Sequence, residues 1–102
     1  MAVVKELDFW DFKREFERWG VEHFFTEEAL KLLYDYLLRW SEEMSHPMVI
    51  SAVALCEDFT EYSDIEEYNR EHDETFNTVE ELGYYHNVIG VLDDGGFVVV
   101  AH

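Results

Sequence analysis

VIGVLDDGGFVVVA, residues 88–101, decides the fold. Residues 88–92 and 97–101 are rich in β-branched side chains, and the Asp-Asp-Gly-Gly sequence at 93–96 between them is typical of a turn. The two acids and two glycines resemble part of a calcium loop, but the twelve-residue pattern that ends in a glutamate is missing. The stretch therefore predicts a β-hairpin.

The segment that precedes the hairpin predicts one more strand and two short helices. Residues 48–56, MVISAVALC, place apolar side chains on both faces of an expected strand. This pattern is typical of a strand that is covered on both sides. His46-Pro47 marks the end of the helix before it. The capping boxes Ser63-x-x-Glu66 and Thr78-x-x-Glu81 predict helices over residues 64–72 and 79–83.

The first half of the chain predicts two helices. Over residues 8–19 apolar side chains recur at helical spacing and form one stripe: Phe9, Phe12, Phe16 and Trp19. Gly20 follows as a signal for the end of the helix. A longer helix over residues 27–44 has Thr26 as its N-cap and Phe25 and Leu30 placed for a hydrophobic staple. Its stripe is Leu30, Leu33, Leu37, Trp40 and Met44.

Together these elements predict a single α+β domain over residues 1–102. Its two N-terminal helices pack on a three-stranded, mainly antiparallel sheet, and short acidic helices lie between the first strand and the C-terminal hairpin. The length suits one domain, and no Gly/Ser-rich linker divides the chain.

The charge of the chain is strongly negative and unevenly distributed. There are 24 acids and 7 bases, a net charge of −17, and every base except Arg70 lies within residues 1–41. Nucleic acids and anionic membranes need Lys and Arg on their binding partners, so neither is expected to bind directly. Electrostatic steering favours a basic protein surface, above all one that itself binds nucleic acid.

The acidity is concentrated in residues 57–81, which contain 11 acids and one base. We predict that carboxylates of this segment bind the partner: Glu57, Asp58, Glu61, Asp64, Glu66, Glu67, Glu71, Asp73 and Glu74. The alternative is a solvated face that serves solubility only. As a single extended helix the segment would carry one charge per about 4 Å, against about 1.7 Å for duplex DNA, so DNA mimicry requires the charges to be concentrated by folding or dimerisation.

The aromatic residues interleaved with these acids are Phe59, Tyr62, Tyr68 and Phe76. Aromatic side chains among charges can anchor an interface, and some of these four are expected in the core.

No motif for catalysis or cofactor binding is present, so the prediction is a protein that is not an enzyme and has no catalytic, cofactor-binding or metal-binding residue. The histidines lack metal-site spacing, and the single Cys56 is expected to be a small buried hydrophobe with a raised thiol pKa. The remaining alternative is an enzyme or a protein that binds a divalent cation through its carboxylates. One cysteine suits a reducing cytoplasm, and neither a signal peptide nor a membrane span is expected.

Several stretches resemble a family of small acidic proteins common in bacteriophages and prophages. They are Phe24-Phe25-Thr26 with residues 28–37, Val53-Ala54-Leu55-Cys56 with residues 59–62, residues 64–69, and residues 94–99; the Ala101-His102 end departs from the pattern. The resemblance implies a setting in the bacterial host cytoplasm and a role as an inhibitor of a host defence protein, such as an anti-CRISPR or anti-restriction protein. The alternative is a phage accessory or structural protein that forms a homodimer through apolar surface.

Overall fold

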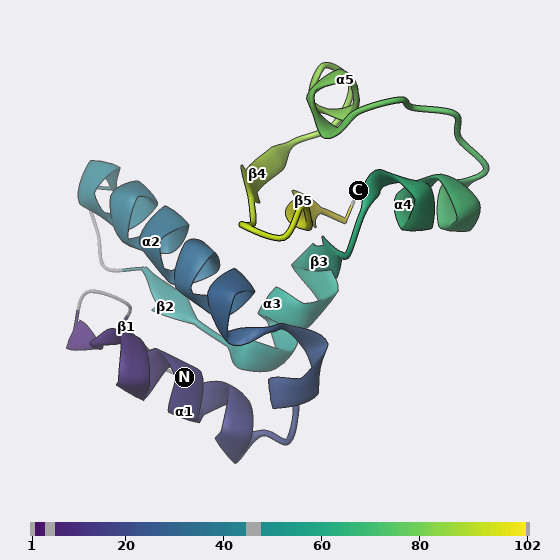
Figure 1. Cartoon of the computed structure of the whole chain (residues 1–102). Helices are drawn as coiled ribbons and strands as arrows, with labels where there is room; N and C mark the ends of the chain where they lie inside the picture. Colours follow the sequence, from purple (N-terminus) through teal and green to yellow (C-terminus); the bar gives the residue numbers. More distant parts are fainter. Residues whose placement is uncertain (1, 4–5, 45–47, 102) are drawn as a thin grey trace.

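The computed structural model describes residues 2–3, 6–44 and 48–101 and has an α+β fold. Two N-terminal helices lie against a three-stranded antiparallel sheet, with short helices between the strands (Figure 1). The elements in chain order are β1 (Ala2–Val3), α1 (Phe9–Arg18), η2 (Glu22–Phe24), α2 (Glu27–Glu43), β2 (Val49–Ile50), α3 (Ala52–Asp58), β3 (Phe59–Tyr62), α4 (Ile65–His72), α5 (Val79–Gly83), β4 (Val88–Val91) and β5 (Phe97–Val100).

The C-terminal hairpin forms as predicted and supplies two of the three strands. The strand order is β3-β5-β4, and both pairs are antiparallel. Gly95 has φ +91° in the turn, a conformation that a residue with a Cβ rarely adopts, and the Leu92 N–H donates to the Gly96 carbonyl at 2.7 Å. A bulge interrupts the register between Val88 and Gly90.

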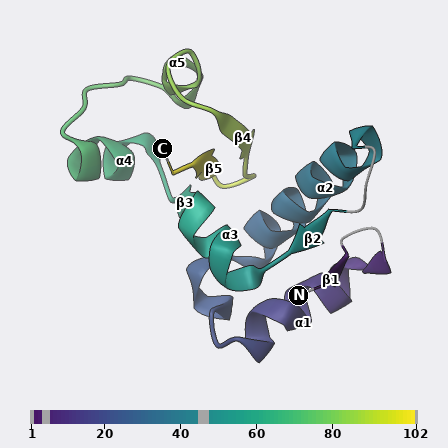
Figure 2. The same cartoon turned by 180° about the vertical axis from the view of Figure 1, so that it is seen from behind.

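The central strand β5 is buried on both of its faces. Val98 belongs to a core shared with α1, α2 and α3, whereas Phe97 and Val99 belong to a second core with α4 and α5. This alternation follows from the two-residue period of a strand. The sheet is therefore a middle layer, with the N-terminal helices on one side and the two short acidic helices on the other (Figures 1 and 2).

The predicted strand over residues 48–56 is wrong. Only Val49–Ile50 is a strand, and it pairs with Ala2–Val3 in a separate two-stranded ribbon. Ser51 then caps α3 by accepting a hydrogen bond from the Ala54 N–H at 3.4 Å, and Ala52 and Leu55 are buried one helical turn apart. A good N-cap and helix-compatible spacing outweigh the β-branched composition, because tertiary packing decides ambiguous apolar runs.

The third strand of the sheet is β3, within the segment that was predicted to be acidic surface. Phe59 and Tyr62 are buried, and the strand pairs with β5 from Phe59↔Val100 to Tyr62↔Phe97. The expected order of first strand, acidic helices and hairpin is therefore kept, although the first strand begins eleven residues later than predicted.

Helix α1 confirms the helix predicted over residues 8–19. The Asp8 carboxylate caps it by accepting from the Asp11 N–H at 2.8 Å, and Gly20 ends it with φ +70°. Phe12 and Phe16 are fully buried, but Trp19, at the end of the same stripe, is 56% exposed. The stripe therefore extends past the edge of the core.

Helix α2 confirms the helix predicted over residues 27–44, with Thr26 as its N-cap at 3.2 Å from the Ala29 N–H. Phe25 and Leu30 are both buried, as a hydrophobic staple requires, whereas Trp40 is exposed. The helix break predicted at His46-Pro47 lies outside the described residues.

Both short acidic helices form where they were predicted, with one change of cap. Thr78 caps α5 by accepting from the Glu81 N–H at 3.1 Å. In α4 the cap is Asp64, which accepts from the Glu67 N–H at 2.8 Å, and Glu67 in turn accepts from the Ser63 N–H at 2.8 Å. The N-cap is therefore Asp64 and not the expected Ser63, and Glu67, not Glu66, is the acid that reaches back to the backbone before the helix.

Candidate binding surface

The nine carboxylates predicted to bind a partner are distributed over three elements. Glu57 and Asp58 lie in the last turn of α3, Glu61 lies on β3, and the other six lie on α4 and in the residues that flank it. Seven are exposed, whereas Glu61 and Glu67 are half-buried. The fold therefore brings the α4 acids together and places Glu57 and Asp58 beyond the opposite end of β3.

Three of the nine carboxylates make hydrogen bonds within the fold. Glu61 accepts from the N–H and the hydroxyl of Thr26, while Asp64 and Glu67 cap α4. Their oxygen atoms are engaged in holding secondary structure together, so they are poor choices for testing partner binding by substitution.

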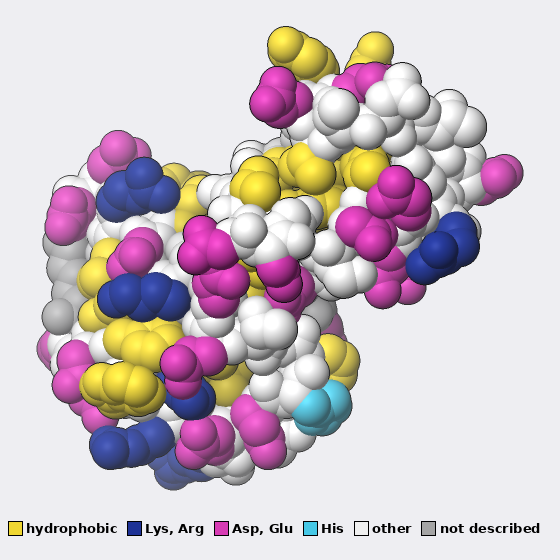
Figure 3. Space-filling model, viewed as in Figure 1, with side chains coloured by type: hydrophobic (Ala, Val, Ile, Leu, Met, Phe, Trp, Pro, Cys, Tyr) yellow, Lys and Arg dark blue, Asp and Glu magenta, His cyan; other side chains and the backbone are white. Residues whose placement is uncertain are grey.

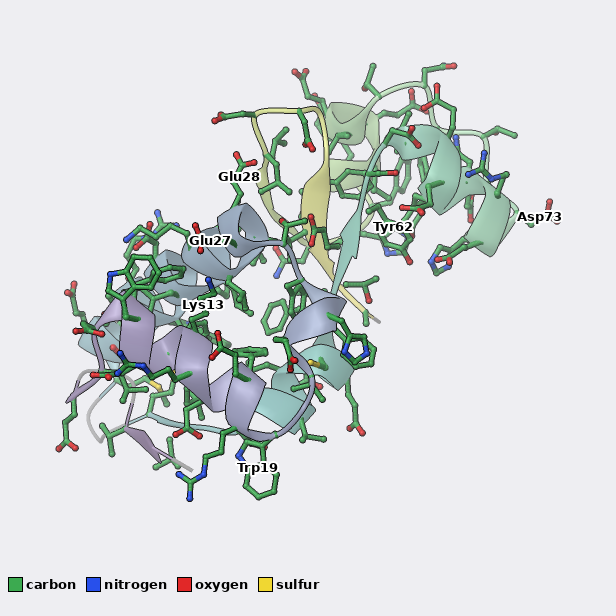
Figure 4. The ribbon with its side chains drawn as sticks, turned by 60° about the horizontal axis from the view of Figure 1, so that its bottom comes forward. Lys13, Trp19, Glu27, Glu28, Tyr62 and Asp73 are labelled. Carbon is green, nitrogen blue, oxygen red and sulfur yellow. The ribbon has the colours of Figure 1, made fainter. Side chains whose placement is uncertain are left out.

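The other six carboxylates make no ion pair within the described part of the chain, although Glu71 interacts with the Tyr62 hydroxyl. We refer to them as the acidic surface: Glu57, Asp58, Glu66, Glu71, Asp73 and Glu74. Asp73, at the far end of α4 (Figure 4), has φ +54° and donates its N–H to the Asn69 carbonyl. An aspartate tolerates this left-handed conformation better than most residues do.

Four of the described basic residues form ion pairs, and all four lie in the other half of the molecule. The four ion pairs found over residues 2–3, 6–44 and 48–101 all lie within residues 11–35, and the closest joins Lys13 to Glu27 at 2.6 Å (Figure 4). In Figure 3 the N-terminal helices mix blue and magenta groups, whereas the part that carries α4 and α5 is mainly white, yellow and magenta, with a blue group at its edge. The negative charge of residues 57–81 is therefore left largely uncompensated.

Three of the four aromatic residues of the acidic segment belong to the core. Phe59, Tyr62 and Tyr68 are buried, and Phe76 is half-buried. The Tyr62 ring stacks on Phe97 at 5.5 Å and its hydroxyl lies 2.9 Å from Nε2 of His72. Tyr62 and Tyr68 hold α4 on the sheet, and the three buried rings are core residues and not the interface anchors that their sequence context suggested.

Burial and the neighbouring carboxylates disfavour ionisation of the buried tyrosines. Burial, followed by Glu71, raises the pKa of Tyr62 to about 12, and burial also raises the pKa of Tyr68. Cys56 is half-buried, and burial raises the pKa of its thiol, as predicted. None of these groups is activated as a nucleophile or as a base near neutral pH.

The exposed aromatic pair after α5 was missed in the sequence. Tyr84 is 85% exposed and Tyr85 is 72% exposed, and together they follow the short helix that buries Leu82. The signal in the sequence was that two large aromatic residues directly follow Gly83, at the end of the predicted short helix, where no helical face continues to bury them.

Within the described residues, no helix is long and apolar enough to cross a membrane, and no group of three or more His, Cys, Asp or Glu side chains is placed to hold a metal ion. A comparison of the chain with protein-family models, curated proteins and solved structures finds no match.

Proposed function

We propose that the protein binds a basic, nucleic-acid-binding protein through its acidic surface and inhibits it. The observation that carries this proposal is the lack of compensating charge. Six exposed carboxylates have no Lys or Arg partner among the described residues, whereas the acids of the N-terminal helices include four that are paired. An uncompensated negative field of this kind accelerates the approach of a basic partner.

The placement of Glu57 and Asp58 supports a role other than stability. Both lie in the last turn of α3, which contains no basic residue. The C-terminal end of a helix carries partial negative charge, and an acid there destabilises the helix by about 0.3–1 kcal/mol. Sequences depart from such local preferences mainly at functional sites.

The resemblance to small acidic phage proteins adds the particular target, a defence protein of the bacterial host. Proteins that cut or bind invading DNA expose basic grooves for its phosphates. A carboxylate-rich surface that occupies such a groove competes with the nucleic acid for the same Lys and Arg side chains. This mode of inhibition requires no catalytic residue.

The proposal is tested with two variants of equal charge. In the surface variant, Glu57, Asp58, Glu66 and Glu71 are replaced by Lys; in the control variant, the exposed Glu6, Glu17, Glu22 and Glu42 are replaced by Lys. Immobilised wild-type protein captures partners from bacterial lysate, and the Kd of each captured protein is then measured for all three forms, with and without competing duplex DNA.

We expect the surface variant to lose binding, the control variant to keep most of it, and DNA to compete with the wild-type protein. Equal Kd values for the surface variant and the wild-type protein would refute the proposal. Equal losses in both variants would mean that net charge alone attracts the partner, and would refute the assignment to this surface.

A second candidate function is self-association through apolar surface. Three tryptophans, Trp10, Trp19 and Trp40, are each more than half exposed on the N-terminal helices. Exposed large aromatic side chains are enriched at protein interfaces. A dimer mass that stays the same at low and high salt would support this function, whereas a monomer at both would exclude it.

A further inference from the structure

A small pocket opens between the loop after α4 and the end of α5. It lies outside the acidic surface, except that Glu74 belongs to both. Its volume is about 280 Å³, and it is lined by Glu74, Thr75, Phe76, Glu81, Tyr85 and His86. Phe76 packs against Tyr85 at 5.8 Å between ring centroids and against His86 at 6.5 Å, nearly perpendicular. Three rings and two carboxylates therefore face a common space.

The backbone around this pocket is held in place by hydrogen bonds. The Asn69 side chain donates to the Phe76 carbonyl at 2.8 Å and accepts from the Phe76 N–H at 3.1 Å. On the other side, the N–H groups of Tyr85 and His86 both donate to the Leu82 carbonyl, at 3.0 and 2.9 Å. A site whose walls are already positioned loses little entropy when a ligand enters.

The chemistry of the lining favours a cation. No Lys or Arg lines the pocket, and neither Glu74 nor Glu81 takes part in an ion pair within the described ranges. Aromatic faces and carboxylates both attract positive charge, and a planar guanidinium can stack on a ring while it donates hydrogen bonds to a carboxylate. Pockets for drug-sized ligands usually measure about 300–1,000 Å³, so this one suits a single side chain.

We propose that this pocket receives an arginine side chain of the partner protein, stacked on Tyr85 and Phe76 and hydrogen-bonded to Glu74 and Glu81. This inference rests on the proposed function, since it assumes a basic protein partner. It adds a specific anchor to an otherwise diffuse electrostatic attraction, because a planar guanidinium can stack on the rings while it donates hydrogen bonds to the carboxylates, and an ammonium group has no such plane.

The direct test uses three blocked tripeptides, acetyl-Gly-Xaa-Gly-amide, where Xaa is arginine, lysine or citrulline. Citrulline matches arginine in shape and lacks its charge. Each is titrated into the isotopically labelled full chain, and NMR shifts are followed. We expect saturable shifts at Phe76, Tyr85 and His86 with arginine, weaker shifts with lysine and none with citrulline. Equal effects of arginine and citrulline, or shifts only elsewhere, would overturn the inference.

Substitutions provide the matched controls. Tyr85→Ala should weaken arginine-peptide binding by about tenfold, whereas Tyr84→Ala, at the neighbouring and more exposed ring, should leave it unchanged. The pair Glu74→Gln with Glu81→Gln should abolish binding, whereas Glu57→Gln with Glu66→Gln changes the net charge equally and should preserve most of it. Equal effects of the two members of either comparison would contradict the inference.

The failure of this inference and that of the proposed function have different signatures. If Tyr85→Ala leaves partner binding intact and the surface variant loses it, the pocket inference is wrong and the proposed function stands. If the arginine peptide occupies the pocket while the surface variant still binds its partner with full affinity, the pocket takes arginine but the acidic surface is not the interface.

Discussion

The Glu61 carboxylate accepts two hydrogen bonds from Thr26, one from the N–H at 2.7 Å and one from the hydroxyl at 2.8 Å. Thr26 is at the same time the N-cap of α2, since its hydroxyl oxygen accepts from the Ala29 N–H. One acid of β3 thereby joins the sheet to the start of the longest helix, across 35 positions of sequence. Some acids within residues 57–81 therefore stabilise the fold, while others form the acidic surface.

Replacing Glu61 should therefore cost stability. We expect Glu61→Ala to lower the free energy of unfolding by about 1–3 kcal/mol, because hydrogen bonds to a charged acceptor are stronger than neutral ones and Thr26 would lose its partner. Urea unfolding followed by circular dichroism measures the change. Glu57→Ala is the control and should lie within about 0.5 kcal/mol of the wild-type protein. Equal losses at the two positions would contradict the role assigned to Glu61.

The cap of α4 can be tested by comparing two neighbouring residues. Asp64→Ala should cost about 1 kcal/mol, because the Glu67 N–H loses its acceptor at the start of the helix. Ser63→Ala should cost much less, since the Ser63 hydroxyl makes only a 3.3 Å contact with Glu67. Denaturant midpoints of the two variants measure the difference. A larger loss for Ser63→Ala than for Asp64→Ala would contradict this assignment and support Ser63 as the N-cap.

Gly96 is required by the close approach of two backbone segments. A Cβ at this position would lie 2.9 Å from the Tyr62 carbonyl oxygen, which cannot move without disturbing β3. Gly96→Ala should therefore cost about 1–3 kcal/mol. Gly83→Ala is the control, because a Cβ there meets no atom within 4 Å and alanine is a better helix former. Thermal unfolding compares the two, and a harmless Gly96→Ala would show that the turn adjusts freely.

Alkaline pH should destabilise the fold through Tyr62. Its pKa is about 12 in the folded protein against an ordinary value of 10.0, so the folded state retains a proton that the unfolded state releases. Stability linked to this group is complete below pH 10 and is lost as the pH rises through 12. Tyr62→Phe should reduce this alkaline loss, whereas Tyr84→Phe, at an exposed ring, should not. Equal pH dependence in both variants would exclude Tyr62 as the cause.

The elements with a strong local signal could be predicted from the sequence. The hairpin followed from two β-rich runs around a Gly-containing turn, and α2 followed from the Thr26 cap and its apolar stripe. Both signals depend on near neighbours in the chain. The α+β class followed from the order of these elements.

The region from Val49 to Tyr62 could not be assigned in the same way. Its apolar residues fit either a strand or a helix, and the choice depends on packing against α1 and β5, which are distant in sequence. The division of the acids into structural and exposed groups has the same origin, because Thr26 meets Glu61 only in the folded chain. The pocket at Tyr85 likewise depends on the Asn69 contact with Phe76.

The most direct test of the proposed function is the salt dependence of partner binding by the two charge variants. The Kd of the captured partner is measured for the wild-type protein, the surface variant and the control variant at 50 and 300 mM salt. The proposed function predicts a steep loss of affinity with salt in the wild-type and control proteins, and weak, salt-insensitive binding in the surface variant. A surface variant with wild-type affinity and wild-type salt dependence would contradict it.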